Sequence, residues 1–395
     1  MVEPMNQSAI RVNALNQKSL NERANKSLFI SAGDPSGDIA GFHFLRRFVA
    51  ENPAVEVFGL GGKRMSQAGQ EQFVDGDKLA ALGFWEVARK YRFFRRLFDK
   101  TLAEIDRRQP SVALLIDYPG FNLRLARKLK ERRIPVVYYI SPQVWAWGAR
   151  RIPHMKELID RLLVILPFEV DFFAAHNISA EYVGHYLLDD IAPDILNAPY
   201  NPQSRTIALL PGSRQQEVDR MLPTMLHVAR ELGTDGWDIR ICGRSAGLDY
   251  TNILREFADL RDKLVIDKTR ETVASAALVI SSSGTATLET ALIGRPLIVL
   301  YKTGALTYQI ACRLVKLKNI ALANIVAGET VAPEFIQHEA NTKNIVTQAH
   351  ELLDSEDKRL MMVERFLSVR KKMRLADGVS PSETVAQIIA DYYPS

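Results

Sequence analysis

Four segments combine glycine turns with hydroxyl or charged side chains, and each directly follows a short apolar run. They are SAGDPSGDIAG at 31–41, LLIDYPGFN at 114–122, ALLPGSRQQEV at 208–218 and ISSSGTATLETA at 280–291. In open α/β proteins, the loops that follow strands are where ligands bind. We therefore expect these segments to carry the chemistry.

The first segment leads into FHFLRRF, which we predict to be helical. Its glycines follow a GxxxGxxxG spacing, so Gly33 and Gly37 let backbone amides approach a substrate, with Ser36 beside them. This is not the GxGxxG of dinucleotide sites, and NAD binding is disfavoured. The alternative is a tight turn in which Ser36 or Asp38 caps the helix.

Asp117 ends the apolar run LLI and is followed by a Pro-Gly turn. A carboxylate at a strand end can accept the proton of a sugar hydroxyl as that hydroxyl attacks. The alternative is that Asp117 caps a helix over 123–130. Downstream, Trp145 and Trp147 lie in SPQVWAW, where they either contact a sugar or acyl chain or fill a core.

The third segment predicts an anion site suited to a diphosphate. Gly212 and Ser213 form a small-residue turn, Arg214 supplies a guanidinium, and a helix begins near Gln215. Amide donors, the helix dipole and a cation thus meet at one place.

The fourth segment is again a strand, a hydroxyl-rich turn and a helix. Amides and hydroxyls at Ser283, Gly284 and Thr285 can cradle a phosphate, and Glu289 can accept hydrogen bonds from ribose hydroxyls. The alternative is a helix capped by Ser283 or Thr285.

The elements that position these loops follow a βα rhythm of apolar runs, each succeeded by an amphipathic stretch. The runs fall at 27–32, 55–60, 112–116, 136–140 and 162–166, then at 206–210, 238–242, 263–266, 278–281 and 296–301. The pattern predicts an α/β fold of two doubly wound Rossmann-like domains facing a central cleft. We assign 1–26 to a polar, disordered tail, 27–200 to the N-terminal domain, and 201–395 to the C-terminal domain, whose last helices cross back.

Composition narrows the function classes. The chain has 395 residues, 47% of them hydrophobic, and a net charge of +5 with a pI near 9.0. That charge is spread over both halves, which argues against nucleic-acid binding. No apolar run is long enough to span a bilayer, and Cys242 and Cys312 have neither disulfide nor metal spacing.

Residues 89–98 interleave five cations with aromatic and aliphatic residues. That composition suits an anionic lipid surface, or else a solvated helix face whose aromatics point into the core.

Together these segments resemble the lipid-A-disaccharide synthase family over about residues 27–390. The resemblance rests on SAGDPSGD, GLGGKRM, LIDYPGFN, YYISPQVWAW, ILPFE, YVGHYLLD, LLPGSRQQEV, SSSGTATLETAL and NIVAGETVAPEFIQ, in this order. It implies a GT-B fold, no metal or other cofactor, and an inverting transfer of 2,3-diacylglucosamine from its UDP derivative to 2,3-diacylglucosamine 1-phosphate (lipid X). The product implied is a β-1,6 disaccharide 1-phosphate, a lipid A precursor.

The resemblance also implies roles for single residues. Asp117 matches the candidate base and Arg214 the arginine of the diphosphate site, while His185 matches an interdomain histidine that contacts phosphate or sugar, or serves the hinge. It further implies a cytoplasmic protein bound peripherally to the inner membrane through residues 89–98, and makes a homodimer conceivable. Tyr186, Pro35 and Ser111 depart from the usual pattern, which leaves acyl-chain and donor specificity open.

Two other readings remain. A UDP-N-acetylglucosamine 2-epimerase or another GT-B transferase would share the nucleotide half. A catalytically silent nucleotide-sugar binding module would bind UDP without turnover, against which Asp117 argues.

Overall fold

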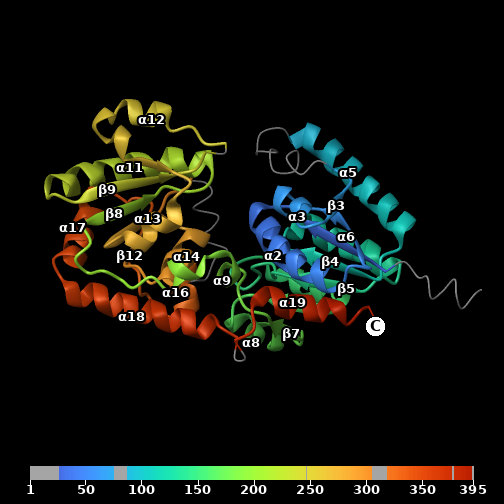
Figure 1. Cartoon of the computed structure of the whole chain (residues 1–395). Helices are drawn as coiled ribbons and strands as arrows, with labels where there is room; N and C mark the ends of the chain where they lie inside the picture. The colour runs from blue at the N-terminus through green and yellow to red at the C-terminus, as the bar shows by residue number, and fades with distance from the viewer. Residues whose placement is uncertain (1–25, 75–86, 246, 305–317, 376–377, 394–395) are drawn as a thin grey trace, which may run out of the picture.

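The computed structural model describes residues 26–74, 87–245, 247–304, 318–375 and 378–393. They form two parallel sheets, each with helices around it (Figure 1). This confirms the prediction of two doubly wound α/β halves. Cys312 and the tail up to residue 25 lie outside the described residues.

The first sheet has seven strands in the order β3-β2-β1-β4-β5-β6-β7. Its strands are β1 (Ser27–Ala32), β2 (Glu56–Leu60), β3 (Glu71–Gln72), β4 (Val112–Ile116), β5 (Val136–Tyr139), β6 (Arg161–Val164) and β7 (Ala180–Tyr182). The helices between them are α2 (Pro35–Glu51), α3 (Lys63–Gln67), α5 (Val87–Arg108), α6 (Pro119–Glu131), α7 (Ile152–Leu158) and α8 (Phe168–Ala174).

The second sheet has six strands in the order β10-β9-β8-β11-β12-β13. Its strands are β8 (Thr206–Leu210), β9 (Asp238–Gly243), β10 (Leu264–Ile266), β11 (Leu278–Ser282), β12 (Leu297–Tyr301) and β13 (Glu334–Ile336). Its helices are α11 (Gln215–Thr234), α12 (Thr251–Arg255), α13 (Thr269–Ser275), α14 (Thr285–Ile293), α16 (Leu322–Ala327), α17 (Thr342–Leu353) and α18 (Glu356–Met373). The short helices α9 (Leu187–Asp190) and α10 (Pro193–Leu196) join the two halves.

The central strands read as uninterrupted apolar runs because helices cover both of their faces. All five residues of β4 are buried, as are those of β11. In register, Ile30 of β1 lies opposite Leu114 of β4, and Ile280 of β11 lies opposite Leu209 of β8. Each sheet therefore holds its carboxyl edge rigidly, and the loops at that edge inherit a fixed position.

The C-terminal helices connect the halves. α18 packs on α14 of the second half, whereas α19 (Pro381–Ala390) packs on α2 of the first (Figure 1). At the end of the described chain, the Tyr393 hydroxyl donates to the carbonyl of Ser27 at 2.9 Å. The last helix thus anchors the C-terminus to the first strand of the other half.

A buried arginine fixes the connection to the second half. Arg295, only 1% exposed, donates to the carbonyls of Ala198 and Pro199 in the connecting segment at 3.0 and 3.2 Å, and to that of Ala274 at 2.8 Å. Burial lowers the pKa of Arg295 to about 10. Gly294, Arg295 and Pro296, which precede β12, therefore hold the connection between the halves in place.

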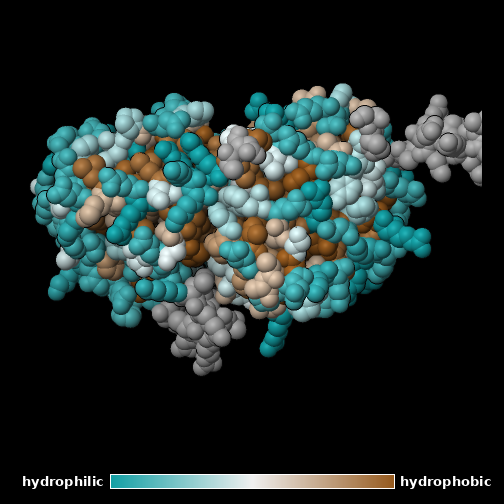
Figure 2. Space-filling view, turned by 90° about the horizontal axis from the view of Figure 1, so that it is seen from below, coloured by the Kyte–Doolittle hydropathy of each residue, from teal (hydrophilic) through white to brown (hydrophobic). Residues whose placement is uncertain are grey.

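The surface carries mixed polarity. On the face seen from below, hydrophilic residues dominate the rim, and hydrophobic residues show in patches toward the middle of each half (Figure 2). Within the described part of the chain, no helix combines the length and apolarity needed to cross a bilayer.

The predicted basic-aromatic segment lies in α5. Phe93, Phe94 and Phe98 are half-buried and pack on the core, while Arg95 and Arg96 are exposed. The side chains of residues 89–92 lie outside the described set. The described aromatic side chains therefore face the core, as the second of the two interpretations of residues 89–98 predicts.

Candidate active site

The four predicted loops lie at the two points where strand order reverses. β1 and β4 are neighbours, and the loops that follow them carry 33–37 and Asp117; β8 and β11 are likewise neighbours, and their loops carry 212–214 and 283–285. Connections from adjacent strands leave in opposite directions at such a point and open a crevice for ligands. The topology therefore brings the predicted residues together in pairs of loops.

Asp117 sits in a strained turn. Asp117 and Tyr118 have φ values of +45° and +49°, which non-glycine residues seldom adopt. The helix α6 begins at Pro119 with Tyr118 as its N-cap, and no side chain caps it. The alternative in which Asp117 caps a helix over 123–130 is therefore wrong, and its carboxylate is available for another role.

Asn122 holds this turn in place. Its amide nitrogen donates to the carbonyls of Asp117 and Ile116 at 2.8 and 3.2 Å, and its oxygen accepts from the Ser31 hydroxyl at 2.7 Å. The Tyr138 hydroxyl also donates to the Asp117 carbonyl, at 2.6 Å. These buried bonds join the ends of β1 and β4 and offset the cost of the strained backbone.

The Asp117 carboxyl is paired with that of Asp34. Burial, the neighbouring charge of Asp34 and a hydrogen bond from protonated Asp117 to Asp34 together raise the pKa of Asp117 to about 7, although a hydrogen bond from the Tyr118 amide opposes them. Asp34 in turn caps α2, because its Oδ1 accepts from the Gly37 amide at 2.7 Å. A carboxyl group with a pKa near neutrality is suited to general base catalysis.

A buried glutamate orders the loop that carries the tryptophans. Glu169 accepts from the Ser141 hydroxyl at 2.5 Å, the Trp145 indole at 3.1 Å and the Leu166 amide at 2.9 Å, and its burial raises its pKa. Trp145 is half-buried and packs on the core. Trp147 is 47% exposed, with the Arg151 guanidinium 5.0 Å above its ring. The two tryptophans thus divide between core and surface.

The first loop combines close packing with helix capping. A side chain at Gly33 would meet the Tyr118 ring, with the nearest atom 2.3 Å from its Cβ. Ser36 is hydrogen-bonded to Tyr186, and Asp38 accepts from the amides of Gly62 and Met65 at 2.9 and 3.1 Å. The cap is therefore Asp34, and the alternative that placed Ser36 or Asp38 there is wrong.

In the second half, Arg214 lies at the start of α11, as the sequence predicts. Its side chain is 79% exposed and pairs with Glu217 at 3.2 Å. The other oxygen of Glu217 accepts from the Ser213 amide at 2.9 Å, and its side chain lies against Gly212. A carboxylate thus already occupies the donors that we predicted for an anion.

The N-terminus of α14 has no side-chain cap among the described residues. Gly284 is the N-cap residue at a φ of +155°, and a Cβ there would meet nothing within 4 Å. The Ser283 hydroxyl donates instead to the Ile320 carbonyl at 3.3 Å. The capping alternative for Ser283 and Thr285 is therefore wrong, and this helix start is open to an anion.

Glu289 belongs to an ion-pair network between the halves. Arg270 of α13 donates to Glu289 and, at 2.5 Å, to Asp190 of α9. Asp190 also pairs with His43 of α2 at 2.8 Å, and these partners hold its pKa well below the usual range despite its burial. The residue predicted to hold ribose is thus connected through Arg270 to the first half.

His185 is buried beside this network. Its Nδ1 accepts from the Leu187 amide at 3.2 Å, and burial lowers its pKa to about 3. The imidazole is therefore neutral at pH 7, so any contact with a phosphate rests on hydrogen bonding.

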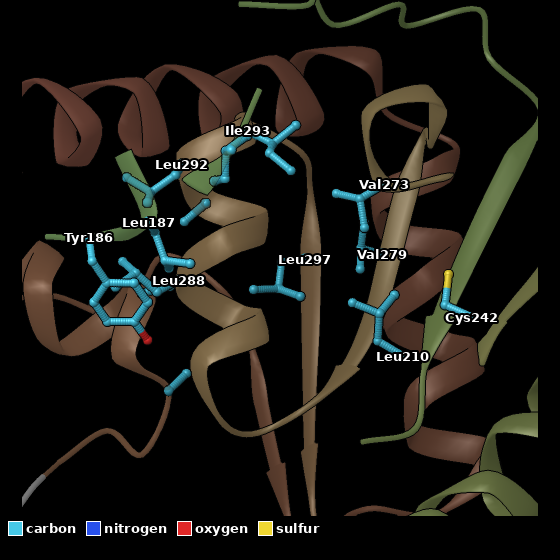
Figure 3. Close-up of a cluster of buried hydrophobic side chains, with 14 of the residues drawn as sticks. Tyr186, Leu187, Leu210, Cys242, Val273, Val279, Leu288, Leu292, Ile293 and Leu297 are labelled. Carbon is cyan, nitrogen blue, oxygen red and sulfur yellow. The ribbon is translucent and has the colours of Figure 1, made fainter. Parts of the chain in front are cut away.

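The neighbouring Tyr186 bridges the halves. With Leu187 it packs against Leu288 and Leu292 of α14 (Figure 3), while its hydroxyl reaches Ser36 of the first loop. The first loop and the α14 helix thus meet at Tyr186.

Sequence reasoning missed four functional candidates: Asp34, Asn122, Glu169 and Arg270. The first three stand inside the segments that it singled out, in SAGDPSGD, LIDYPGFN and ILPFE. Their signal was a polar residue beside a strand end, but their partners lie far away in sequence. Arg270 follows a short strand and lies in no recognisable sequence motif. Within the described residues, no three His, Cys, Asp or Glu side chains gather as a metal site would require.

The chain resembles known proteins over most of its length. The model of the family described as Lipid-A-disaccharide synthetase matches residues 28–388. The chain is 38% identical to the lipid-A-disaccharide synthase of Trichlorobacter lovleyi (88% of this chain, 93% of the relative). It is also 38% identical to that of Syntrophus aciditrophicus, with 91% and 97% covered.

Solved structures with a similar fold are more distant in sequence. A glycotransferase of kitacinnamycin superposes with a TM-score of 0.61 at 14% identity, covering 93% of this chain and 99% of its own. A putative UDP-N-acetylglucosamine 2-epimerase from Listeria monocytogenes gives 0.59 at 13%, covering 93% and 97%. At these identities the likeness concerns the fold alone, which is GT-B.

Proposed function

The chain belongs to the lipid-A-disaccharide synthetase family, and we propose how its residues carry out the transfer of a glycosyl group. It is a lipid-A-disaccharide synthase, a glycosyltransferase that takes a UDP-sugar donor and a lipid acceptor. We propose that the donor is UDP-2,3-diacylglucosamine and that the acceptor is 2,3-diacylglucosamine 1-phosphate.

The observation that carries the mechanism is the Asp117–Asp34 pair. Asp117 takes the proton from the acceptor 6-hydroxyl as that oxygen attacks the anomeric carbon of the donor. The bond from that carbon to the phosphate oxygen breaks, and its electron pair leaves with UDP. Attack opposite the leaving group inverts the configuration, in agreement with a β-1,6 linkage.

The departing UDP gathers negative charge on its diphosphate. Arg214 and the open amides at Gly284 and Thr285 stabilise that charge, with Gly212 and Ser213 at the neighbouring helix start. Glu217 holds the Ser213 amide and Arg214, so donor binding requires the diphosphate to displace that carboxylate. Glu289 accepts from the ribose hydroxyls while Arg270 orients it.

Residues of the first loop and His185, just before α9, complete the site. Gly33 gives the acceptor access to the backbone of the first loop, and Gly37 positions Asp34 by donating its amide to that carboxylate. Ser36 stays bonded to Tyr186, and the Nε2–H of His185 donates to sugar or phosphate. We further propose that residues 89–98 contact the cytoplasmic face of the inner membrane, which the exposed Arg95 and Arg96 support. A homodimer is also part of this proposal.

The proposal is tested by incubating purified protein with both acylated substrates, with and without chelator, and detecting disaccharide phosphate and UDP by mass spectrometry. Formation of both products by the wild-type protein, and by Asp34→Asn but not Asp117→Asn, is the expected result. A UDP-sugar epimer in place of the disaccharide would point to the 2-epimerase. UDP binding without either product would point to a silent binding module.

A further inference from the structure

An apolar groove of about 680 Å³ lies beside the candidate base, between α5, α6 and α7. Its apolar wall consists of Phe94, Phe98, Tyr118, Phe121, Leu123 and Leu158. That volume falls within the roughly 300–1,000 Å³ of ligand sites in proteins. Buried and half-buried aromatic and aliphatic walls favour a hydrocarbon.

The groove starts one residue from the base. Tyr118, which follows Asp117 directly, is part of its wall, and its ring stacks on that of Phe121 with centroids 5.9 Å apart. The other side of the Tyr118 ring lies against Gly33 of the first loop. A molecule that presents a hydroxyl to Asp117 can therefore extend into the groove past Tyr118.

The rim of the groove is cationic. Arg95, Arg124, Arg127, Lys128 and His154 border it. Lys128 pairs with Glu131 at 2.8 Å, whereas the described carboxylates form no ion pair with Arg95, Arg124 or Arg127. Three guanidinium groups around an apolar groove complement an amphiphile with an anionic head.

We propose that this groove holds an acyl chain of the acceptor, with the phosphate of the same molecule on the Arg124 and Arg127 side. The inference rests on the proposed function, because the acceptor is the substrate whose hydroxyl must reach Asp117. A phospholipid of the bulk bilayer has the same hydrocarbon chemistry, but nothing would draw it to the turn that carries the base. The acceptor is therefore the occupant that both the position and the charge of the groove favour.

Gly120 offers a sharp test. It lines the groove near the start of α6, and a Cβ at this position would meet nothing within 4 Å. Gly120→Phe therefore adds an aromatic side chain at the wall of the groove, and its Cβ meets no other atom. Gly233→Phe is the matched control, because Gly233 lies on α11 of the other half and its Cβ would also meet nothing within 4 Å.

Three measurements separate the outcomes. The first is the KM for acceptors bearing tetradecanoyl or butanoyl chains. The second is direct binding of a fluorescent acylated glucosamine 1-phosphate, which needs no turnover. The third is binding to anionic phosphatidylglycerol vesicles. We expect Gly120→Phe to raise the long-chain KM by about tenfold or more, to weaken probe binding to the same extent, and to leave the short-chain KM and vesicle binding unchanged. Gly233→Phe should match the wild type in all three.

The proposal is overturned if Gly120→Phe has the wild-type KM for both the long-chain and the short-chain acceptor. It is also overturned if the wild-type protein does not bind the probe. Loss of binding to anionic phosphatidylglycerol vesicles in Gly120→Phe, with the chain-length dependence intact, would overturn it in favour of a membrane anchor. Probe binding that is sensitive to Gly120→Phe, in a wild-type protein that makes no disaccharide, supports the groove and refutes the proposed reaction instead.

Discussion

Asp117 and Asp34 share a hydrogen bond between their carboxyl groups, although 82 residues separate them along the chain. Asp34 is held by the start of α2 through the Gly37 amide, and Asp117 by the turn that Asn122 clamps. The backbone of Asp117 and the carboxylate of Asp34 are therefore fixed, which keeps the two carboxyls close enough to repel each other when both ionise. The pair therefore sets the proton affinity of the candidate base.

Activity should depend on pH through Asp117. Because the pKa of Asp117 is raised to about 7, its base form grows as pH rises, so kcat/KM should climb about tenfold per pH unit below 7 and level off above it. Asp34→Asn removes the neighbouring charge and should shift the rise of kcat/KM to lower pH. Burial should still keep the pKa of Asp117 above the ordinary aspartate value. The measurement is a pH–rate profile of both proteins. If kcat/KM levels off at the same pH in both, Asp34 does not influence the pKa of the base.

Asp117→Asn should abolish turnover, with a loss of about 100- to 10,000-fold, and leave the Kd for UDP unchanged. Asparagine tolerates a positive φ, so the turn itself should survive. Isothermal titration with UDP provides the binding control. Activity retained at the wild-type level would remove Asp117 as the base.

The same variant should change stability with a definite sign. Between about pH 4 and 7 the native state binds more protons at Asp117 than the unfolded state does, so ionisation of this buried group destabilises the wild type as pH rises. The stability advantage of Asp117→Asn over wild type should therefore grow by about 2 kcal/mol from pH 5 to pH 8. Urea unfolding at both pH values measures it, and an advantage independent of pH would contradict the raised pKa.

The central strands could be predicted from sequence because both of their faces are buried. VALLI of β4 and LIVLY of β12 are apolar without interruption, and Asp117 stands out directly after the first of these runs. The edge strands β3, β7 and β13 were missed. They have two or three residues each, none fully buried, so they carry no apolar signature.

The contacts of the site residues could not be predicted, because they depend on partners far away in the chain. Glu289 was predicted to face a ribose, yet its partner Arg270 comes from another helix and leads on to Asp190 in the first half. Likewise, SAGDPSGD contains three residues suited to a cap, and only the packed structure selects Asp34. Local pattern identifies the loops, whereas tertiary packing decides which side chain in each loop performs which task.

Arg214→Ala should weaken UDP binding by about 10- to 100-fold, since hydrogen bonds to a charged group contribute about 1.5–3 kcal/mol. Binding of uridine, which lacks the diphosphate, should be unchanged. Titration of both ligands into both proteins measures the difference. An equal loss for uridine and UDP would mean that Arg214 does not address the diphosphate.

Arg270→Ala should both destabilise the protein and weaken UDP binding. Arg270 neutralises Asp190, whose side chain is only 8% exposed, and removing one partner of a buried pair costs about 3 kcal/mol. Asp190 has a lowered pKa, so the stability it contributes is present above the ordinary aspartate pKa and is lost as pH falls below it. The destabilisation by Arg270→Ala should therefore be large at pH 7 and shrink toward pH 3.

Asp190→Asn is the matched variant, because it removes the charge that Arg270 serves and leaves Glu289 paired. It should lower stability while UDP affinity stays at the wild-type value, whereas Arg270→Ala should lower both, since Glu289 then loses the group that orients it. Thermal unfolding and UDP titration of the two variants side by side distinguish the roles. If the two variants lower UDP affinity equally, Arg270 acts through the contact between the halves and not through Glu289.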